Sequence, residues 1–223
     1  MNVNVTAVVV AAGTGSRMGF DKVFYKLKGK ETVLYSLKAM EKNDKIDEIV
    51  LVVAECNLEK AGEICKDKFS KLSKIVAGGS SRTQSVINGV MSANGEYVAI
   101  HDGARPLVSQ KVITECIENV EKYDAVTVCL PVTDTIKSFN GEFIEKTLDR
   151  DTMVSVQTPQ CFNRELYLKC TEDSKGISFT DDCALFEACN IPIKLIRGEE
   201  KNIKLTRKAD ILVAEALLEE ENL

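Results

Sequence analysis

The first residues that could do chemistry form a glycine-rich loop near the N-terminus. The segment AAGTGSRMG, residues 11–19, directly follows the apolar run VTAVVV, residues 5–10. Glycines allow a backbone to approach an anion and to turn its N–H groups toward it, which is typical of loops that bind nucleotide phosphates. Arg17 and Lys22 add two cations to the same short segment. We therefore expect phosphate binding here; the alternative is an ordinary strand-to-helix turn with solvated charges.

The loop differs from two familiar phosphate loops. It lacks the Lys-[Ser/Thr] ending of a Walker loop, and Met18 stands where the dinucleotide fingerprint GxGxxG needs its third glycine. That fingerprint also needs an acidic residue about 20 positions further on, to bind a ribose. Glu55 is the best candidate and lies about twice as far away. These differences count against a dinucleotide-dependent oxidoreductase.

A second candidate segment is GGSSRTQSV, residues 78–86, which follows an apolar run and precedes a helical pattern. Such a loop exposes backbone N–H and C=O groups. A cytosine carries an N4 donor and an O2 acceptor, so the backbone of Gly79 and Ser80, with Ser85 beside it, could bind the edge of that base. Taken alone, the segment is more typical of a capped helix start.

A third candidate segment is IHDGARP, residues 100–106, directly after a predicted strand. Open α/β sheets bind ligands at the carboxyl ends of their strands, and magnesium prefers oxygen ligands, so Asp102 is the predicted metal ligand. Gly103 would leave room for a ribose, and Arg105 would support the loop or approach a phosphate. His101, the only histidine, is expected to be structural, because it should point to the opposite face from Asp102.

These loops must be positioned by strands and helices that alternate along the chain. Short β-branched runs predict buried strands at residues 5–11, 48–54, 74–78, 97–102, 125–132 and 191–196. Helical patterns lie between them, which predicts one α/β domain over residues 1–223 with a mostly parallel, doubly wound, Rossmann-like sheet. In residues 135–147, two alternating strands flank Asn140-Gly141, a two-residue hairpin signal. We expect an arm that projects over about residues 134–150.

Composition limits the class of protein. A net charge of −5 counts against a nucleic-acid partner, since there is no global basic field. No apolar run approaches the ~20 residues of a membrane helix, and the N-terminus shows no leader, so we expect a cytoplasmic protein without membrane association. The eight cysteines include no C-x-x-C pair and mostly sit among apolar neighbours, which predicts reduced core residues.

The segment AAGTGSRM, followed by Lys22, resembles the opening signature of nucleotidyltransferases that act on sugar and polyol phosphates. More closely, the chain resembles the 2-C-methyl-D-erythritol 4-phosphate cytidylyltransferase family of non-mevalonate isoprenoid biosynthesis. Beyond the segments above, the resemblance is carried by LPVTDT (130–135), TLDR (147–150), QTPQ (157–160), TDD (180–182) and KNIKLT (201–206). It departs from the family at one point, because many relatives have a longer spacer with Pro-Lys where Asp21-Lys22 closely follows Met18.

The resemblance implies that CMP passes from CTP to a small polyol phosphate, with Mg²⁺ as cofactor and a homodimer formed through the arm. The catalytic residues that it implies are Arg17, Lys22, Arg150 and Lys204. The residues that it assigns to CTP are Ala11, Ala12, Gly13, Thr14, Gly15, Gly79, Ser80, Arg82, Ser85, Asp102 and Gly103. The residues that it assigns to the acceptor are Arg105, Thr135, Arg150, Thr158, Thr180 and Lys204. Asp181 and Asp182 are expected to act on a helix dipole, although relatives place the equivalent residues near the acceptor's hydroxyls.

Two rival functions stay open. The nearest rival has the same chemistry with ribitol 5-phosphate as the acceptor, because the choice between the two polyols depends on a few side chains. The segments around Arg150 and Thr158 look more like the methylerythritol enzymes. A noncatalytic nucleotide-binding regulator would keep the pocket but lose the catalytic cations. Arg17, Lys22 and Asp102 are all present, which counts against the regulator.

Overall fold

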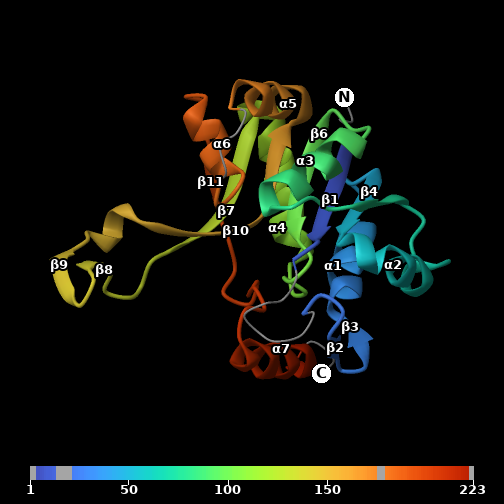
Figure 1. Cartoon of the computed structure of the whole chain (residues 1–223), viewed down its shortest axis with the longest axis horizontal. Coiled ribbons are helices and arrows are strands. Elements are labelled where there is room, and N and C mark those ends of the chain that lie inside the picture. Colours follow the sequence, from blue (N-terminus) through green and yellow to red (C-terminus); the bar gives the residue numbers. More distant parts are fainter. Residues whose placement is uncertain (1–3, 14–21, 175–178, 221–223) are drawn as a thin grey trace.

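The centre of the molecule is a seven-stranded sheet (Figure 1). The computed structural model describes residues 4–13, 22–174 and 179–220. Across the sheet the strands run β11 (Lys194–Arg197), β7 (Ala125–Pro131), β10 (Val154–Asn163), β6 (Tyr97–Asp102), β1 (Val5–Ala11), β4 (Glu48–Val53) and β5 (Leu72–Ala77). The six predicted strands are all present, which confirms the α/β class.

The strand β10 was not predicted, and it is the one antiparallel strand that the structure describes in the seven-stranded sheet. It lies between β6 and β7 and pairs antiparallel with both, whereas the other neighbours in the sheet pair in parallel. Its sequence, VSVQTPQCFN, is polar and contains Pro159, and a proline normally argues against a central strand. The structure accommodates this residue where the register with β7 shifts, between Gln157 and Gln160.

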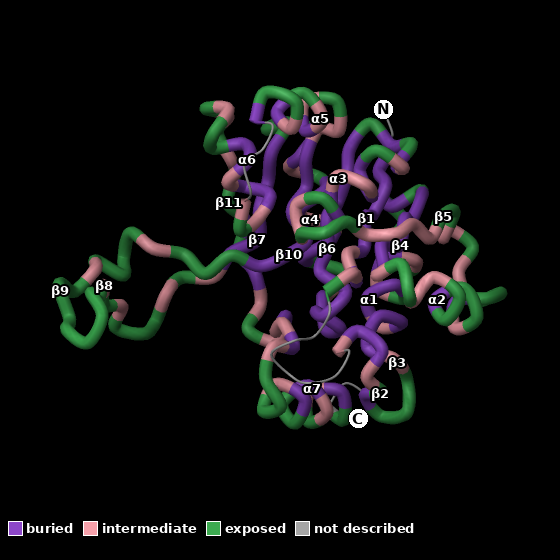
Figure 2. Tube along the Cα trace, in the orientation of Figure 1, coloured by how far each residue is buried: buried purple, intermediate pink, exposed green. Residues whose placement is uncertain are grey.

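Helices cover both faces of the sheet, as a doubly wound fold requires. One face carries α1 (Thr32–Glu41), α2 (Leu58–Cys65) and α4 (Gln110–Tyr123), and the other carries α3 (Arg82–Ser92), α5 (Arg164–Asp173) and α6 (Cys183–Ala188). Successive side chains of a strand point to opposite faces, so Ala7 and Val9 of β1 join the first core and Val8 joins the second. Figure 2 shows the resulting buried sheet between partly exposed helices.

The predicted arm projects away from the sheet as the hairpin β8 (Lys137–Asn140) and β9 (Phe143–Thr147) (Figure 1). The turn lies one residue further along than expected. Asn140 pairs with Phe143, so the loop residues are Gly141 and Glu142, with Gly141 at φ +63°. Glycine at the first loop position is the requirement of a II′-type hairpin turn.

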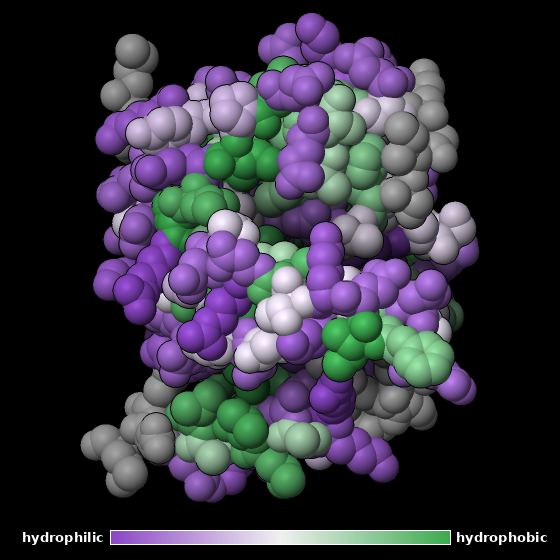
Figure 3. Space-filling model, turned by 90° about the vertical axis from the view of Figure 1, so that its left-hand side faces the viewer, coloured by the Kyte–Doolittle hydropathy of each residue, from purple (hydrophilic) through white to green (hydrophobic). Residues whose placement is uncertain are grey.

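Apolar side chains of the arm are exposed in the single chain. Phe139 is 72% exposed, Phe143 76% and Ile144 67%. Figure 3, which views the molecule from the side toward which the arm projects, shows hydrophobic side chains gathered between polar ones on this face. A two-stranded hairpin of this kind is marginally stable in water without packing partners.

Smaller elements complete the fold at the end of the sheet where α7 lies (Figure 1). They are the hairpin β2 (Lys26–Leu27) and β3 (Lys30–Glu31) and the helix α7 (Lys208–Glu220). Two 3₁₀ turns lie elsewhere: η1 (Glu55–Asn57) precedes α2, and η2 (Arg150–Thr152) follows the arm's second strand. Leu27, Leu107 and Leu205 pack against α7 in a third apolar cluster. Within the described ranges, every helix is too short or too polar to span a bilayer.

Packing of α3 against the sheet depends on Gly89. A Cβ atom at this position would overlap Val8 and would lie 2.7 Å from Cγ2 of Val52. We expect Gly89→Ala to lower the free energy of unfolding by about 1–3 kcal/mol, because the overpacked helix must move off the strands. Urea denaturation measures the change. The matched control is Gly62→Ala in α2, where nothing lies within 4 Å, and it should stabilise by up to about 1 kcal/mol. Equal effects at both positions would contradict the packing argument.

Candidate active site

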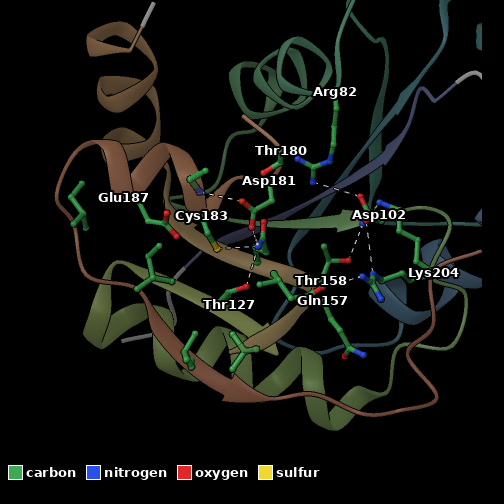
Figure 4. A pocket seen from close by; sticks show the side chains of 18 of the residues that line it. Arg82, Asp102, Thr127, Gln157, Thr158, Thr180, Asp181, Cys183, Glu187 and Lys204 are labelled. Atoms are coloured by element: carbon green, nitrogen blue, oxygen red, sulfur yellow. Dashed lines mark hydrogen bonds and ion pairs between the residues drawn. The ribbon is translucent and has the colours of Figure 1, made fainter. Parts of the chain in front are cut away.

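The carboxylate of Asp102, at the carboxyl end of β6, is surrounded by three cations. Nζ of Lys204 lies 2.7 Å from its Oδ2, Nε of Arg105 lies 3.8 Å from the same oxygen, and an Nη of Arg82 lies 3.6 Å from Oδ1. The cations come from three separate parts of the chain, and Figure 4 shows Arg82 and Lys204 reaching Asp102 from different sides. The four residues come from three separate motifs of the sequence, and the fold brings them together.

Electrostatics keep Asp102 ionised. The residue is 7% exposed, and burial alone would raise the pKa of its carboxyl group. The charges of Lys204, Arg82 and Arg105 outweigh burial and hold that pKa well below its usual value. The carboxylate is therefore charged throughout the neutral pH range, as a metal ligand must be.

Two cavities meet at this carboxylate. The smaller has a volume of about 350 Å³ and the larger about 900 Å³, and Arg82, Asp102 and Lys204 line both. The smaller cavity is also lined by the predicted nucleotide residues Ala11, Ala12, Gly13, Lys22, Gly79, Ser80 and Ser85. At its wall the N–H of Gly79 donates to Oγ of Ser85, 3.0 Å away. The fold thus brings the first two candidate loops to one cavity.

Four of the predicted nucleotide or catalytic residues need separate comment. Thr14, Gly15 and Arg17 lie outside the described residues. Gly103 is described and is not among the residues that line the smaller cavity; a Cβ atom there would lie 3.2 Å from Cβ of Ala11, so the glycine allows close packing against β1.

The larger cavity gathers most of the predicted acceptor residues. Arg105, Thr158, Thr180 and Lys204 line it, as do several polar side chains that sequence reasoning did not assign to the acceptor site. The unassigned polar side chains are Gln160 and five that Figure 4 labels, Thr127, Gln157, Asp181, Cys183 and Glu187. The cavity therefore combines cations at the Asp102 end with hydrogen-bonding groups further along its wall.

Two predicted acceptor residues lie elsewhere in the single chain. Thr135 and Arg150 belong to the exposed arm, and neither is among the described residues that line the two cavities. Arg150 donates a hydrogen bond of 2.7 Å to the backbone oxygen of Thr133. Within one chain, these two residues therefore do not reach the Asp102 carboxylate.

Asp182 has a role that sequence reasoning missed. It stands at the N-cap position of α6, yet its side chain makes no capping hydrogen bond. Its Oδ2 instead lies 2.8 Å from an Nη of Arg82, and its Oδ1 accepts a 2.8 Å bond from the hydroxyl of Tyr167. Asp181 meets the helix-terminus expectation, since its Oδ1 accepts from the N–H of Ala184 at 3.2 Å. The sequence carries no signal for the Asp182 contact, because Arg82 lies 100 positions away.

His101 is structural, as expected. Its side chain is fully buried, with Nδ1 3.0 Å from Oγ1 of Thr158 and Nε2 3.1 Å from the backbone oxygen of Arg105. Burial lowers the pKa of His101 to about 4, so the imidazole is neutral at pH 7. It braces the loop that carries Asp102 and Arg105.

Comparison with known proteins places this site in a family. The sequence model of the 2-C-methyl-D-erythritol 4-phosphate cytidylyltransferase family matches residues 5–220. The protein of that name from Dehalococcoides mccartyi is 41% identical over 222 residues, which cover 98% of this chain and 97% of the relative. The chain belongs to this family. The relative from Caldanaerobacter subterraneus is 42% identical over 224 residues, covering 96% of this chain and 99% of its own.

Solved structures agree with the family assignment. A 4-diphosphocytidyl-2C-methyl-D-erythritol synthase from Anaerococcus prevotii superposes with a TM-score of 0.87 at 28% identity, covering 98% of this chain and 97% of that one. The family's cytidylyltransferase from Thermus thermophilus gives a TM-score of 0.78 at 28% identity, covering 97% and 98%. Membership makes the chain a cytidylyltransferase, and excludes the oxidoreductase and the noncatalytic regulator.

Burial of neutral His101 predicts a pH-dependent stability. The pKa of His101 is about 4 in the folded chain and about 6.5 when unfolded. Between these two pH values the unfolded chain binds a proton at this residue and the folded chain does not, so stability falls as the pH is lowered. Between pH 7 and pH 5 the free energy of unfolding should therefore fall by about 2 kcal/mol more in the native chain than in His101→Gln. Urea unfolding at pH 7, 6 and 5 measures this. Parallel curves for the two proteins would contradict it.

Proposed function

We propose that this cytidylyltransferase transfers CMP from CTP to 2-C-methyl-D-erythritol 4-phosphate, releasing pyrophosphate and giving 4-diphosphocytidyl-2-C-methyl-D-erythritol. The observation that carries the proposal, beyond family membership, is the meeting of two cavities at one ion-paired carboxylate. A nucleotide in the smaller cavity and an acceptor in the larger one would place their phosphates on either side of Arg82, Asp102 and Lys204.

The smaller cavity suits a nucleoside triphosphate. Backbone groups of residues 11–13 would bind phosphate oxygens, and Lys22 would balance charge that develops at the α-phosphorus. The exposed backbone of Gly79 and Ser80 would bind the edge of cytosine. Lys22 is assigned the catalytic role although the spacer between Met18 and Lys22 is shorter than in many relatives, and replacing Lys22 tests this assignment.

The larger cavity suits a small phosphorylated polyol. Arg105 and Lys204 would bind its phosphate, and Thr180 would bind its oxygens. Thr158 donates its hydroxyl proton to His101, so it would bind the polyol by accepting a hydrogen bond from a substrate hydroxyl. The acceptor phosphate is already ionised at pH 7, so its oxygen can attack phosphorus without a general base. This agrees with a neutral His101 whose two ring nitrogens already have partners. The task of the protein is to position two anions and neutralise their charge.

The donor set at Asp102 fits Mg²⁺. Among the described residues, no group of three or more His, Cys, Asp or Glu side chains could hold a metal, so an ion at Asp102 would take its other ligands from phosphate oxygens and water. Magnesium is commonly bound in this way, through one or two carboxylates and the substrate phosphates. When bound, the ion would neutralise triphosphate charge and orient the α-phosphate.

We also infer a cytoplasmic location. All eight cysteines are free thiols, and six of them are buried. Unpaired cysteines are typical of proteins kept in a reducing compartment. The unpaired state of these cysteines therefore supports the inferred cytoplasmic location.

The substrate assignment is tested by measuring pyrophosphate release with each nucleotide and each acceptor. CTP with 2-C-methyl-D-erythritol 4-phosphate should give the highest kcat/KM, and UTP should be slower by roughly tenfold or more, since its O4 would meet backbone acceptors. Ribitol 5-phosphate is the competing acceptor. Faster turnover with ribitol 5-phosphate, or equal turnover with UTP, would overturn the corresponding part of the assignment.

We further propose that the active site is shared between two subunits. The arm presents Phe139, Phe143 and Ile144 to solvent, and a twofold-related arm would cover such a surface. Arg150 and Thr135, at the base of the arm, would then reach the acceptor phosphate in the partner's larger cavity. A guanidinium suits this task, because it can bind two phosphate oxygens in a fixed orientation.

The shared site predicts complementation between two inactive variants. Lys22→Ala subunits mixed with Arg150→Ala subunits should regain activity, because each heterodimer contains one site with both residues intact. Random exchange of equal amounts would leave about a quarter of all sites intact. Pyrophosphate release measures the recovery, and native mass spectrometry confirms that heterodimers form. Heterodimers with no more activity than the separate variants would show that Arg150 serves its own subunit or does not bind the acceptor.

A further inference from the structure

Arg82 stands between two buried carboxylates at unequal distances. One Nη atom lies 2.8 Å from Oδ2 of Asp182, within a charge-assisted hydrogen bond, while the other lies 3.6 Å from Oδ1 of Asp102, beyond one. The guanidinium is therefore bonded to Asp182 and only near Asp102. Because Arg82 lines both cavities, this preference decides where a positive charge lies at their junction.

Asp182 cannot move with Arg82 toward Asp102, because hydrogen bonds from Tyr167 and to Gln160 hold Asp182 in place. Its Oδ1 accepts the hydroxyl of Tyr167 at 2.8 Å, and its backbone N–H donates to Oε1 of Gln160 at 3.3 Å. Asp182 is 3% exposed and Tyr167 is 1% exposed. The ring of Tyr167 packs against Phe162 and Phe186, with centroids 5.7 and 6.0 Å away. The aromatic core therefore fixes the position of the Asp182 carboxylate.

Asp102 would attract Arg82 strongly if Asp182 released it. Lys204 already occupies Oδ2 of Asp102 at 2.7 Å, so Oδ1 is the oxygen that a freed guanidinium would take. A buried carboxylate bonded to both cations would have less charge to offer to any other cation. Arg82 would then lie across the junction between the two cavities.

We propose that Asp182 and Tyr167 are positioning residues that hold Arg82 away from Asp102 and so keep the junction open for the triphosphate. The proposal rests on the proposed function for the identity of the nucleotide. Neither residue lines the smaller cavity, so both act through Arg82. Their removal should weaken CTP binding even though neither would touch CTP.

The variants that test this are nearly isosteric. Asp182→Asn removes the charge that holds Arg82, and Tyr167→Phe removes only the hydroxyl that holds Asp182. Titration calorimetry with CTP and Mg²⁺ should show about 10–100-fold weaker binding for Asp182→Asn, and a smaller loss in the same direction for Tyr167→Phe. In an Arg82→Ala background, Asp182→Asn should change the dissociation constant by less than about twofold, because nothing is left to close on Asp102.

The matched control is Glu48→Gln, at the opposite end of the parallel strands. Glu48 is also a buried carboxylate, 9% exposed, and it accepts hydrogen bonds of 2.7 Å from Thr6 and 2.6 Å from Ser73. Its neutralisation should lower the melting temperature and leave CTP affinity unchanged. This separates loss of a buried charge from loss of Arg82 positioning.

Two results would overturn the proposal. One is that Asp182→Asn weakens CTP binding by the same factor in the native and Arg82→Ala backgrounds, which would indicate a purely structural role. The other is unchanged CTP affinity in both Asp182→Asn and Tyr167→Phe; Tyr167→Phe decides the question if Asp182→Asn does not fold. If the proposed function is wrong, the unsubstituted enzyme will release no pyrophosphate from CTP and the acceptor. The CTP titrations are a separate measurement and still test whether Asp182 and Tyr167 position Arg82.

Discussion

Burial of the Asp102 carboxylate is the constraint on which the rest of the site depends. A buried charge is strongly unfavourable unless other charges and hydrogen bonds compensate it. Here the compensation comes from Arg82 at the start of α3, Arg105 in the loop after β6, and Lys204 ahead of α7. Two distant segments, at Arg82 and Lys204, must therefore converge on the end of β6 and the loop that follows it. The same cations that allow Asp102 to be buried form a positive junction for two anionic substrates.

The antiparallel strand β10 connects this junction to the rest of the fold. Oγ1 of Thr158 accepts the N–H of Asp102 at 3.1 Å, and the backbone oxygen of the same residue accepts an amide N–H of Asn202 at 2.8 Å. Asn202 in turn accepts an Nη–H of Arg105 at 2.7 Å through its backbone oxygen. Two residues further along β10, Gln160 donates to Asp181 and Thr127, both at 3.0 Å. One strand thus supports both the charged end and the hydrogen-bonding wall of the larger cavity.

Much of the fold could be predicted from local patterns, and its exceptions have physical causes. The parallel strands are short, continuous apolar runs because both of their faces are buried. The strand β10 escaped prediction because Pro159 and neighbouring polar residues oppose strand propensity, whereas hydrogen bonding to two neighbours in the sheet outweighs it. The hairpin turn was misplaced by one residue, since the dipeptide signal identifies a glycine turn but not which loop position that glycine takes.

By itself, the sequence determined the groups that can do chemistry: a phosphate loop after the first strand, a carboxylate at the end of β6, and Lys204 in a segment that resembles the family. Such motifs depend on neighbours along the chain, so they can be recognised without coordinates. Only the tertiary structure decided that Arg82 bonds to Asp182 instead of closing on Asp102, that Tyr167 holds Asp182, and that Gly103 packs against β1. These contacts join residues as many as 100 positions apart, and packing of the complete core selects them.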